Sequence, residues 1–273
     1  MSFDMSKRSL FLSLRPGSGL GNRVRALLSA AAIAEAEGRD FYYHWPITNS
    51  FGARMSELWA PVPGEEMAAP GPEPMVTDTQ VDGKWRPASI DRMRADRVIS
   101  VSTAYALRGW GGERDWTDVL AGLTVSPTVD EVIDRDFPGG TADGTTLVGV
   151  QVRAHPTLTH PLTMEKSPVE WFIARMHELQ RADDSVRFFL SADTREAETA
   201  IASAVPGVSF ISKTGKYNSR EGLIESVADL KVLAGTSRIL APYRSSFAEL
   251  AWYMSGRAMP IETSQGTKEA RSR

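Results

Sequence analysis

The 273-residue sequence contains no cysteine. Disulfides, thiolate nucleophiles, iron–sulfur clusters and cysteine-ligated zinc are therefore excluded. Only four histidines are present, and none shows the i, i+4 spacing of a helical zinc motif. We expect no metal site and no bound cofactor.

The sequence has no excess of basic residues, and its first apolar stretch is short. The 31 basic and 34 acidic residues give a net charge of -3, so no global field attracts nucleic acid or anionic lipid. The apolar stretch at residues 10–14 is interrupted by Ser13 and is too short for a signal segment or a membrane span. We expect a cytoplasmic protein that binds neither nucleic acid nor membrane, with an oligomeric state that the sequence leaves open.

Apolar segments of strand length alternate with helical ones along most of the chain. Residues 10–14 and 41–45 are predicted strands around a helix at 22–37, which forms a βαβ unit. A proline-rich loop follows at 60–82, then a strand at 97–101 and a helix at 115–123. Further strands are predicted at 146–152, 186–190, 208–211 and 238–240, and further helices at 168–181, 194–204, 223–234 and 246–254. This alternation predicts an α/β fold of two Rossmann-like domains with a central cleft.

A glycine-rich stretch at residues 138–144 is the best candidate linker. We therefore place an N-terminal Rossmann-like domain at 1–140 and a C-terminal Rossmann-like domain at 145–260. The polar residues 261–273 are expected to be a frayed tail.

The first predicted strand is followed by a turn that contains three glycines, the last of which is Gly21. Such a turn and the helix after it can approach an anion with free N–H groups. Arg23 and Arg25 lie in the first helical turn, where the helix dipole disfavours cations, and a bound diphosphate would offset that cost. The alternatives are a plain β-to-α turn and two solvated arginines.

Two polar residues follow strands of the second half. Arg153 comes after the strand at 146–152, where an arginine fork suits phosphate oxygens, or forms an ion pair with a nearby carboxylate. Asp193 comes after the strand at 186–190. Its carboxylate either accepts hydrogen bonds from a nucleoside or forms a capping box with Glu196.

The turn before the last predicted helix is rich in hydroxyl groups. Ser246 and Glu249 have capping-box spacing, which leaves Ser245 and the first N–H groups of the helix for a phosphate. Phe247 can stack on a base or pack in the core, which is the commoner place for a helical phenylalanine.

Two histidines flank a short loop after Arg153. Each of His155 and His160 is a candidate proton-transfer group or a surface histidine.

In their order and context these segments resemble the fucosyltransferase-like glycosyltransferases, a superfamily that includes the protein O-fucosyltransferases and the bacterial α1,6-fucosyltransferases. The resemblance spans about residues 10–253 and is most specific in the stretches GLGNRVRALLSAAAIAEA and DLKVLAGTSRILAPYRSSFAELA. The matching residues are Gly21-Asn22, Gln151-Val152-Arg153, Ala192-Asp193, Asp229 and Ser245-Ser246-Phe247.

The resemblance implies a GT-B fold, a GDP-sugar donor and metal-independent transfer of a hexosyl or fucosyl group to a hydroxyl acceptor. It implies that the domain at 1–140 is on the acceptor side and that the domain at 145–260 binds the nucleotide sugar. For such a transfer, His155 and then His160 are the candidates for the base that deprotonates the acceptor hydroxyl. The resemblance also implies that Arg153 and Asn22 act on the diphosphate, and that Ser245, Ser246 and Phe247 surround the donor nucleotide. Gln151 stands where the family has a histidine, and the chain is shorter than most members, so the donor's base and sugar stay open. Other candidate functions are a different transferase with a phosphorylated nucleotide donor, and a nucleotide-binding protein without catalysis.

Overall fold

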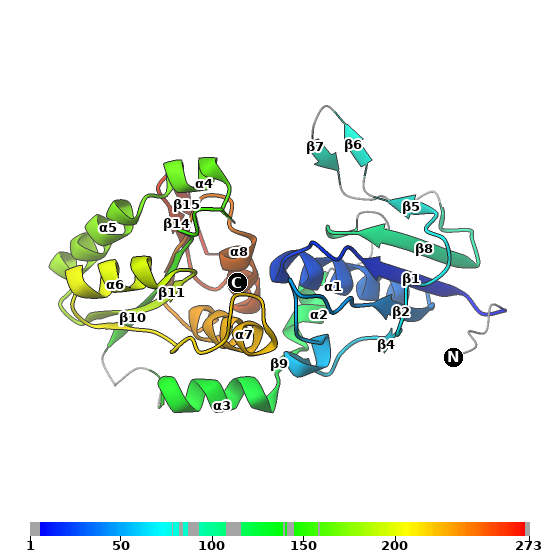
Figure 1. Cartoon of the computed structure of the whole chain (residues 1–273), viewed down its shortest axis with the longest axis horizontal. Coiled ribbons are helices and arrows are strands. Elements are labelled where there is room, and N and C mark those ends of the chain that lie inside the picture. The colour runs from blue at the N-terminus through cyan, green and yellow to red at the C-terminus, as the bar shows by residue number, and fades with distance from the viewer. Residues whose placement is uncertain are drawn as a thin grey trace. The chain divides into compact units, whose positions relative to one another are not determined.

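The computed structural model describes residues 6–77, 79–81, 84–86, 93–107, 116–138, 140, 145–157 and 159–270. The chain divides into two compact units (Figure 1). Unit 1 comprises Met1–Thr124 and Asn218–Arg220, and unit 2 comprises Val125–Tyr217 and Glu221–Arg273.

The first division between the units lies before helix α3 (Pro127–Asp136), not at the predicted linker, of which residues 139 and 141–144 are outside the described residues. Two contacts tie the end of α3 to unit 2. The ring of Phe137 packs edge-on against Phe189 with centroids 5.4 Å apart, and Asp136 Oδ2 accepts a hydrogen bond from the Ser212 N–H. Helix α3 was not among the elements predicted from the sequence, so its contacts with the rest of unit 2 were not predicted either.

The sheet of unit 1 has the strand order β4-β2-β1-β8-β5, with all neighbours parallel. The predicted βαβ unit is confirmed by β1, α1 and β2. The elements around the sheet are β1 (Ser9–Leu14), α1 (Leu20–Ala36), β2 (Asp40–His44), β4 (Glu65–Glu66), β5 (Val76–Thr77), β8 (Val98–Thr103) and α2 (Trp116–Ala121).

The segment predicted as one loop at 60–82 is not wholly irregular. It supplies β4 and β5 to the sheet, and it begins in β3 (Trp59–Ala60), which pairs with β9 (Thr124–Val125). A hairpin of β6 (Thr79–Val81) and β7 (Lys84–Arg86) and a 3-10 helix, η1 (Met55–Glu57), complete the unit. In this proline-rich segment, strands of two or three residues show no periodicity and stand beside no apolar run, which explains why the sequence did not predict them.

The sheet of unit 2 has the order β12-β11-β10-β13-β14-β15, parallel except for its last pair. Its strands are β10 (Thr146–Val152), β11 (Val186–Ala192), β12 (Val208–Ser209), β13 (Arg238–Leu240), β14 (Ile261–Thr263) and β15 (Gly266–Lys268). Its helices after α3 are α4 (Pro161–Lys166), α5 (Val169–Ala182), α6 (Arg195–Ala204), α7 (Arg220–Ala234) and α8 (Ser246–Met254).

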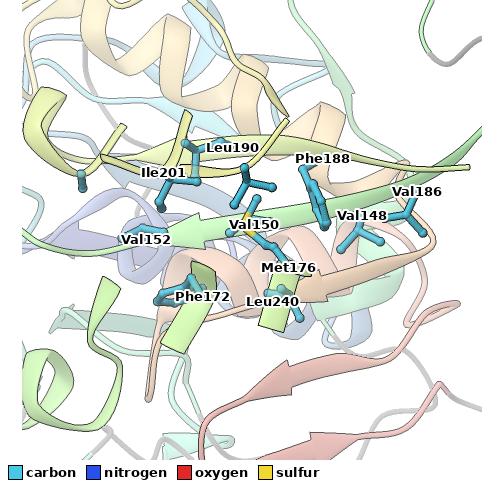
Figure 2. Close-up of a cluster of buried hydrophobic side chains, with 12 residues drawn as sticks. Val148, Val150, Val152, Phe172, Met176, Val186, Phe188, Leu190, Ile201 and Leu240 are labelled. Carbon is cyan, nitrogen blue, oxygen red and sulfur yellow. The ribbon is translucent and has the colours of Figure 1, made fainter. Parts of the chain in front are cut away.

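Figure 1 shows α5 and α6 on one side of this sheet and α7 and α8 on the other. Alternate residues of β10, such as Val148 and Val150, face Phe172 and Met176 of α5 in a buried cluster (Figure 2). Gly149 points to the opposite side, where a side chain would meet Leu233 of α7 at 2.7 Å. The prediction of an α/β fold with two units of mainly parallel sheet is confirmed.

The expectation of a frayed tail from residue 261 is wrong. Ile261 is buried, and β14 pairs in parallel with β13. Glu262 receives hydrogen bonds from Arg175 and Arg238, which tie the strand to α5 and β13. The tail is therefore part of the sheet, although its composition is polar.

Candidate functional site

Three predicted segments meet at one edge of the unit 2 sheet. β10, β11 and β13 are parallel neighbours, so their carboxyl ends lie at the same edge. Arg153 follows β10, Asp193 follows β11, and residues 241–245 lead from β13 into α8. Arg153 Nε lies 3.8 Å from Asp193 Oδ2, and the side chain of Arg153 is 28% exposed. The ion pair expected as an alternative is thus present, and the guanidinium keeps surface for a ligand.

Asp193 orders the loop that carries Arg153. Its Oδ1 accepts a hydrogen bond from the Ala154 N–H at 2.7 Å, and its Oδ2 accepts one from Thr159 Oγ1 at 3.4 Å. The capping residue of α6 is Thr194, whose side chain accepts from the Ala197 N–H. The capping-box alternative for Asp193 is therefore wrong, and its carboxylate belongs to the edge of the sheet.

Ser245, not Ser246, caps α8. Ser245 Oγ accepts a hydrogen bond from the Ala248 N–H at 3.2 Å and donates one to Gln151 Oε1 at 2.8 Å. A hydroxyl has one proton, so Ser245 has none left to donate to a phosphate while this pair is intact. The expectation that Ser246 would cap and Ser245 would remain available is thus reversed.

The start of α8 is the part of this edge best suited to an anion. Ser246 and Phe247 are its first two residues, and the first N–H groups of a helix have no intrahelical partner. Both side chains are half-buried, so Phe247 does not belong to the buried face of the helix. The dipole of α8 adds positive potential at the same point.

Asp229 of α7 contacts Ser191 near the end of β11 and is 2% exposed. Its Oδ2 accepts hydrogen bonds from Ser191 Oγ at 2.7 Å and from Lys213 Nζ at 2.6 Å. Burial raises the pKa of Asp229, against the opposing effect of Lys213. Its Oδ1 is buried and has no hydrogen-bond partner among the described residues. A direct role in binding would fall to this second oxygen.

Lys213 is the residue at this edge that the sequence did not indicate. It lies in the irregular segment between β12 and α7, and its Nζ also donates to the Glu225 carbonyl. Glu225 in turn accepts from the Thr214 and Gly215 N–H groups. Nothing in the spacing of Lys213 and Asp229 predicts this contact, because it depends on how the loop folds back onto α7.

The two histidines near Arg153 serve as local backbone caps. His155 Nδ1 accepts from the Thr157 N–H at 3.3 Å, and His160 Nδ1 accepts from the Leu162 N–H at 3.2 Å. An accepting Nδ1 carries no proton, so the neutral rings are protonated on Nε2. The ring of His155 also packs 5.9 Å from that of Tyr217. This arrangement suits a hydrogen-bond donor better than the predicted base.

The first turn of α1 in unit 1 holds Gly21 and Asn22, but Arg23 in the same turn does not face a ligand. Arg23 is fully buried, and its guanidinium donates to the carbonyls of Pro16, Ser18 and Pro46 at 2.8–2.9 Å. Burial lowers its pKa to about 10. The assignment of Arg23 to the donor site is therefore wrong: its cost at a helix start is offset by carbonyls of the chain itself.

Two aromatic rings complete the surroundings of Arg23. Its guanidinium carbon lies 3.9 Å from the ring centre of Phe51 and 5.4 Å from that of Trp45.

Asn22 is half-buried, and its Oδ1 accepts a hydrogen bond from Arg25 Nη2 at 2.7 Å. Gly21 is buried in the helix. Of the residues predicted in this turn, Asn22 and Arg25 are half-buried and so keep side-chain surface.

No protein-family model and no curated protein matches this chain. Solved structures do match. The fucosyltransferase NodZ from Bradyrhizobium has 16% sequence identity over 97% of this chain and 100% of that chain, with a TM-score of 0.61. Arabidopsis thaliana FUT1, as a mutant in complex with GDP, has 13% identity over 93% of this chain and 70% of that chain, with a TM-score of 0.57. POFUT1 in complex with GDP-fucose has 9% identity over 92% and 94%, with a TM-score of 0.56.

This chain has the fucosyltransferase fold. The likeness extends over nearly its whole length, in agreement with the resemblance found in its motifs. NodZ has also been solved after soaking with GDP-fucose, with 17% identity and a TM-score of 0.60 to this chain.

In the described ranges, no group of three or more histidine, aspartate or glutamate side chains is arranged to hold a metal ion. None of the helices within those ranges has the length and apolar character needed to cross a bilayer.

Proposed function

We propose that the protein is a glycosyltransferase that moves a sugar from a nucleoside-diphosphate sugar, preferably a GDP-sugar, to a hydroxyl acceptor. The observation that carries the proposal is the edge of the unit 2 sheet, where Arg153 and the start of α8 follow two adjacent parallel strands. This edge is where parallel sheets bind ligands, and fucosyltransferases of the same fold have been crystallised with GDP and GDP-fucose.

The proposed reaction is a displacement at the anomeric carbon of the donor sugar. The bond from the anomeric carbon to the diphosphate oxygen breaks, a bond to the acceptor oxygen forms, and the proton of the acceptor hydroxyl passes to the leaving diphosphate. Negative charge grows on the leaving nucleoside diphosphate while the sugar takes oxocarbenium character. Groups placed where this charge develops lower the barrier most.

Residues on unit 2 supply the charge stabilisation in this proposal. Arg153 contributes its fork, and Ser246 contributes a hydroxyl and a helix-start N–H. Asp193 keeps the Arg153 loop in place, and Asp229 has a buried oxygen for a donor group of the base. Phe247, half-buried at the same helix start, is proposed to pack on the nucleoside.

His155 and Asn22 have more open parts in the reaction. With its proton on Nε2, His155 is proposed to donate a hydrogen bond to the leaving group, and His160 is the second candidate. Gly21 and Asn22 are proposed to contribute from unit 1, the acceptor side. We further propose that transfer needs neither a metal nor another cofactor, and that the protein acts in the cytoplasm without nucleic-acid or membrane partners.

A ligand screen tests the proposal against its rivals. The melting temperature is measured with GDP, UDP, ADP and adenosine 3′,5′-bisphosphate. A ligand at about 100 times its Kd adds about 2.7 kcal/mol to the stability of the folded state, which is a clear shift. Stabilisation by GDP above the others supports the proposal. A shift with the bisphosphate alone would favour a different transferase, and binding of GDP without any turnover of GDP-sugars would favour a regulatory protein.

A further inference from the structure

Gln151 connects the strand that carries Arg153 with the start of α8. It is the penultimate residue of β10 and is 4% exposed, while Ser245, the cap of α8, is 8% exposed. The two side chains meet at 2.8 Å between Ser245 Oγ and Gln151 Oε1. This is a buried hydrogen bond between two elements that are 94 residues apart in the sequence.

A glutamine at this position is costly unless its amide has a partner. β10 is a central strand, and its other buried side chains, such as Val150 and Val152, are apolar. Burial of an amide without hydrogen bonds is strongly unfavourable, so Gln151 depends on Ser245 and on the Val152 carbonyl, which Nε2 reaches at 3.3 Å. An apolar residue would fill the same space without this dependence.

The Ser245 hydroxyl makes two hydrogen bonds, one to β10 and one within α8. Its only proton goes to Gln151, and one of its lone pairs accepts the Ala248 N–H. Because the hydroxyl donates to β10 and accepts from α8, the two hydrogen bonds together fix the orientation of the first turn of α8 relative to β10. The N–H groups and the Ser246 hydroxyl that begin α8 are then held in place relative to Arg153.

We propose that Gln151 is a positioning residue of the diphosphate site: it holds Ser245 as the cap of α8 and takes its only proton. This inference rests on the proposed function, because it assumes a diphosphate at the start of α8. Ser245 then acts through the helix, and the phosphate is contacted by the Ser246 hydroxyl and by the N–H groups of Ser246 and Phe247. Ser245 itself makes no contact with the phosphate.

The test compares GDP with guanosine, which lacks the diphosphate. Affinities are measured by calorimetry for GDP and by NMR titration for guanosine, with the wild type, Gln151→Met, Ser245→Ala and the double variant. Gln151→Met keeps the length of the side chain but removes the acceptor. We expect it to weaken GDP by about tenfold, the size of one lost hydrogen bond, and to change guanosine by less than about twofold.

Two further variants separate positioning from general stability. Gln151→His retains an acceptor for Ser245 and should keep GDP affinity within about threefold of the wild type, as a single hydrogen bond can be re-formed. Ser237→Ala is the matched control: it removes the hydrogen bond from Ser237 Oγ to the Leu147 carbonyl at the opposite end of β10. It should leave GDP affinity unchanged.

The outcomes are distinct. Ser245→Ala should lose at least as much GDP affinity as Gln151→Met, because it removes the cap on the Ala248 N–H as well as the contact with Gln151. The double variant should lose no more than Ser245→Ala, because Gln151 acts only through Ser245. Three results would overturn the role of Gln151 and leave the proposed function standing. These are unchanged GDP binding by Gln151→Met, equal losses for GDP and guanosine, and additive losses in the double variant. If Gln151→Met does not fold, Ser245→Ala gives the same comparison of the two ligands. A wild type that binds no GDP would overturn the proposed function, and this inference with it.

Discussion

Arg153 is the side chain on which the proposed chemistry depends most. It is partly exposed and lies 3.8 Å from Asp193, so its removal opens no core cavity. Arg153→Ala should keep its melting temperature within about 3 °C of the wild type. It should lose roughly 3 kcal/mol of transition-state stabilisation, or two orders of magnitude in turnover. Melting curves and single-turnover rates measure both quantities.

Arg153→Lys is the informative companion variant. It keeps the charge but loses the planar fork, so it should recover only part of the rate. If Arg153→Ala turns over GDP-sugar like the wild type, Arg153 does not belong to the site.

Arg23 is expected to stabilise unit 1 and not to bind a ligand. Arg23→Met keeps most of the volume but leaves three carbonyls without their donor, of which those of Ser18 and Pro46 are buried. We expect a loss of about 2–4 kcal/mol in the free energy of unfolding. Arg187→Met is the control, because exposed Arg187 also donates to backbone carbonyls, and it should cost less than about 1 kcal/mol. Equal stability of both variants, measured by urea denaturation, would contradict this role.

Arg23 also shows where reasoning from the sequence ends. The helix dipole correctly marks an arginine at a helix start as a cost that needs an explanation. Sequence alone cannot tell whether the compensating partner is a ligand or the chain itself. Here the partners are carbonyls of the preceding turn and of Pro46, which is close only after β2 has folded beside β1.

Among the elements, β14 is held to the sheet by a charged cluster. Glu262 accepts hydrogen bonds from Arg175 and Arg238, each at 2.5 Å. Burial alone would raise the pKa of Glu262, but the two arginines outweigh it and the pKa is lowered. A lowered pKa in the folded state stabilises the protein above the unfolded value of about 4.3, and this contribution is lost as the pH falls through the folded value.

Glu262→Gln should therefore reduce the stability of unit 2 by about 2 kcal/mol at pH 7. The difference from the wild type should shrink as the pH falls below about 4, where the wild-type carboxyl also becomes protonated. Urea denaturation across this pH range provides the measurement. A difference that stays constant down to pH 3 would show that the charge of Glu262 contributes nothing.

The same cluster explains which elements could be predicted from the sequence. β10 and α8 follow from apolar runs and turn residues, and so do the strand ends that bring Arg153 and Asp193 together. The strand β14 has only three residues, Ile-Glu-Thr, and is stabilised by arginines from two other elements. A pattern confined to one segment contains no information about such partners, so the segment was predicted to be a frayed tail.

At the scale of the whole molecule, transfer is expected to proceed without a divalent ion. The charge on the leaving diphosphate is assigned to Arg153 and the start of α8, which need no metal to act. Turnover of a GDP-sugar in excess EDTA should stay within about twofold of the untreated rate, since no step depends on metal chemistry. Loss of activity in EDTA that Mn²⁺ or Mg²⁺ restores would refute the metal-independent mechanism.

The central claim is that this fold binds and activates a nucleotide sugar at the edge of the unit 2 sheet. Slow release of nucleoside diphosphate from GDP-fucose, measured without acceptor, tests it most directly. Water replaces the acceptor in this assay, so the unknown acceptor is not needed. The account predicts release by the wild type, faster than from UDP-glucose, and release at least about 100-fold slower by Arg153→Ala. No release by the wild type from either donor, or equal release by both proteins, would contradict it.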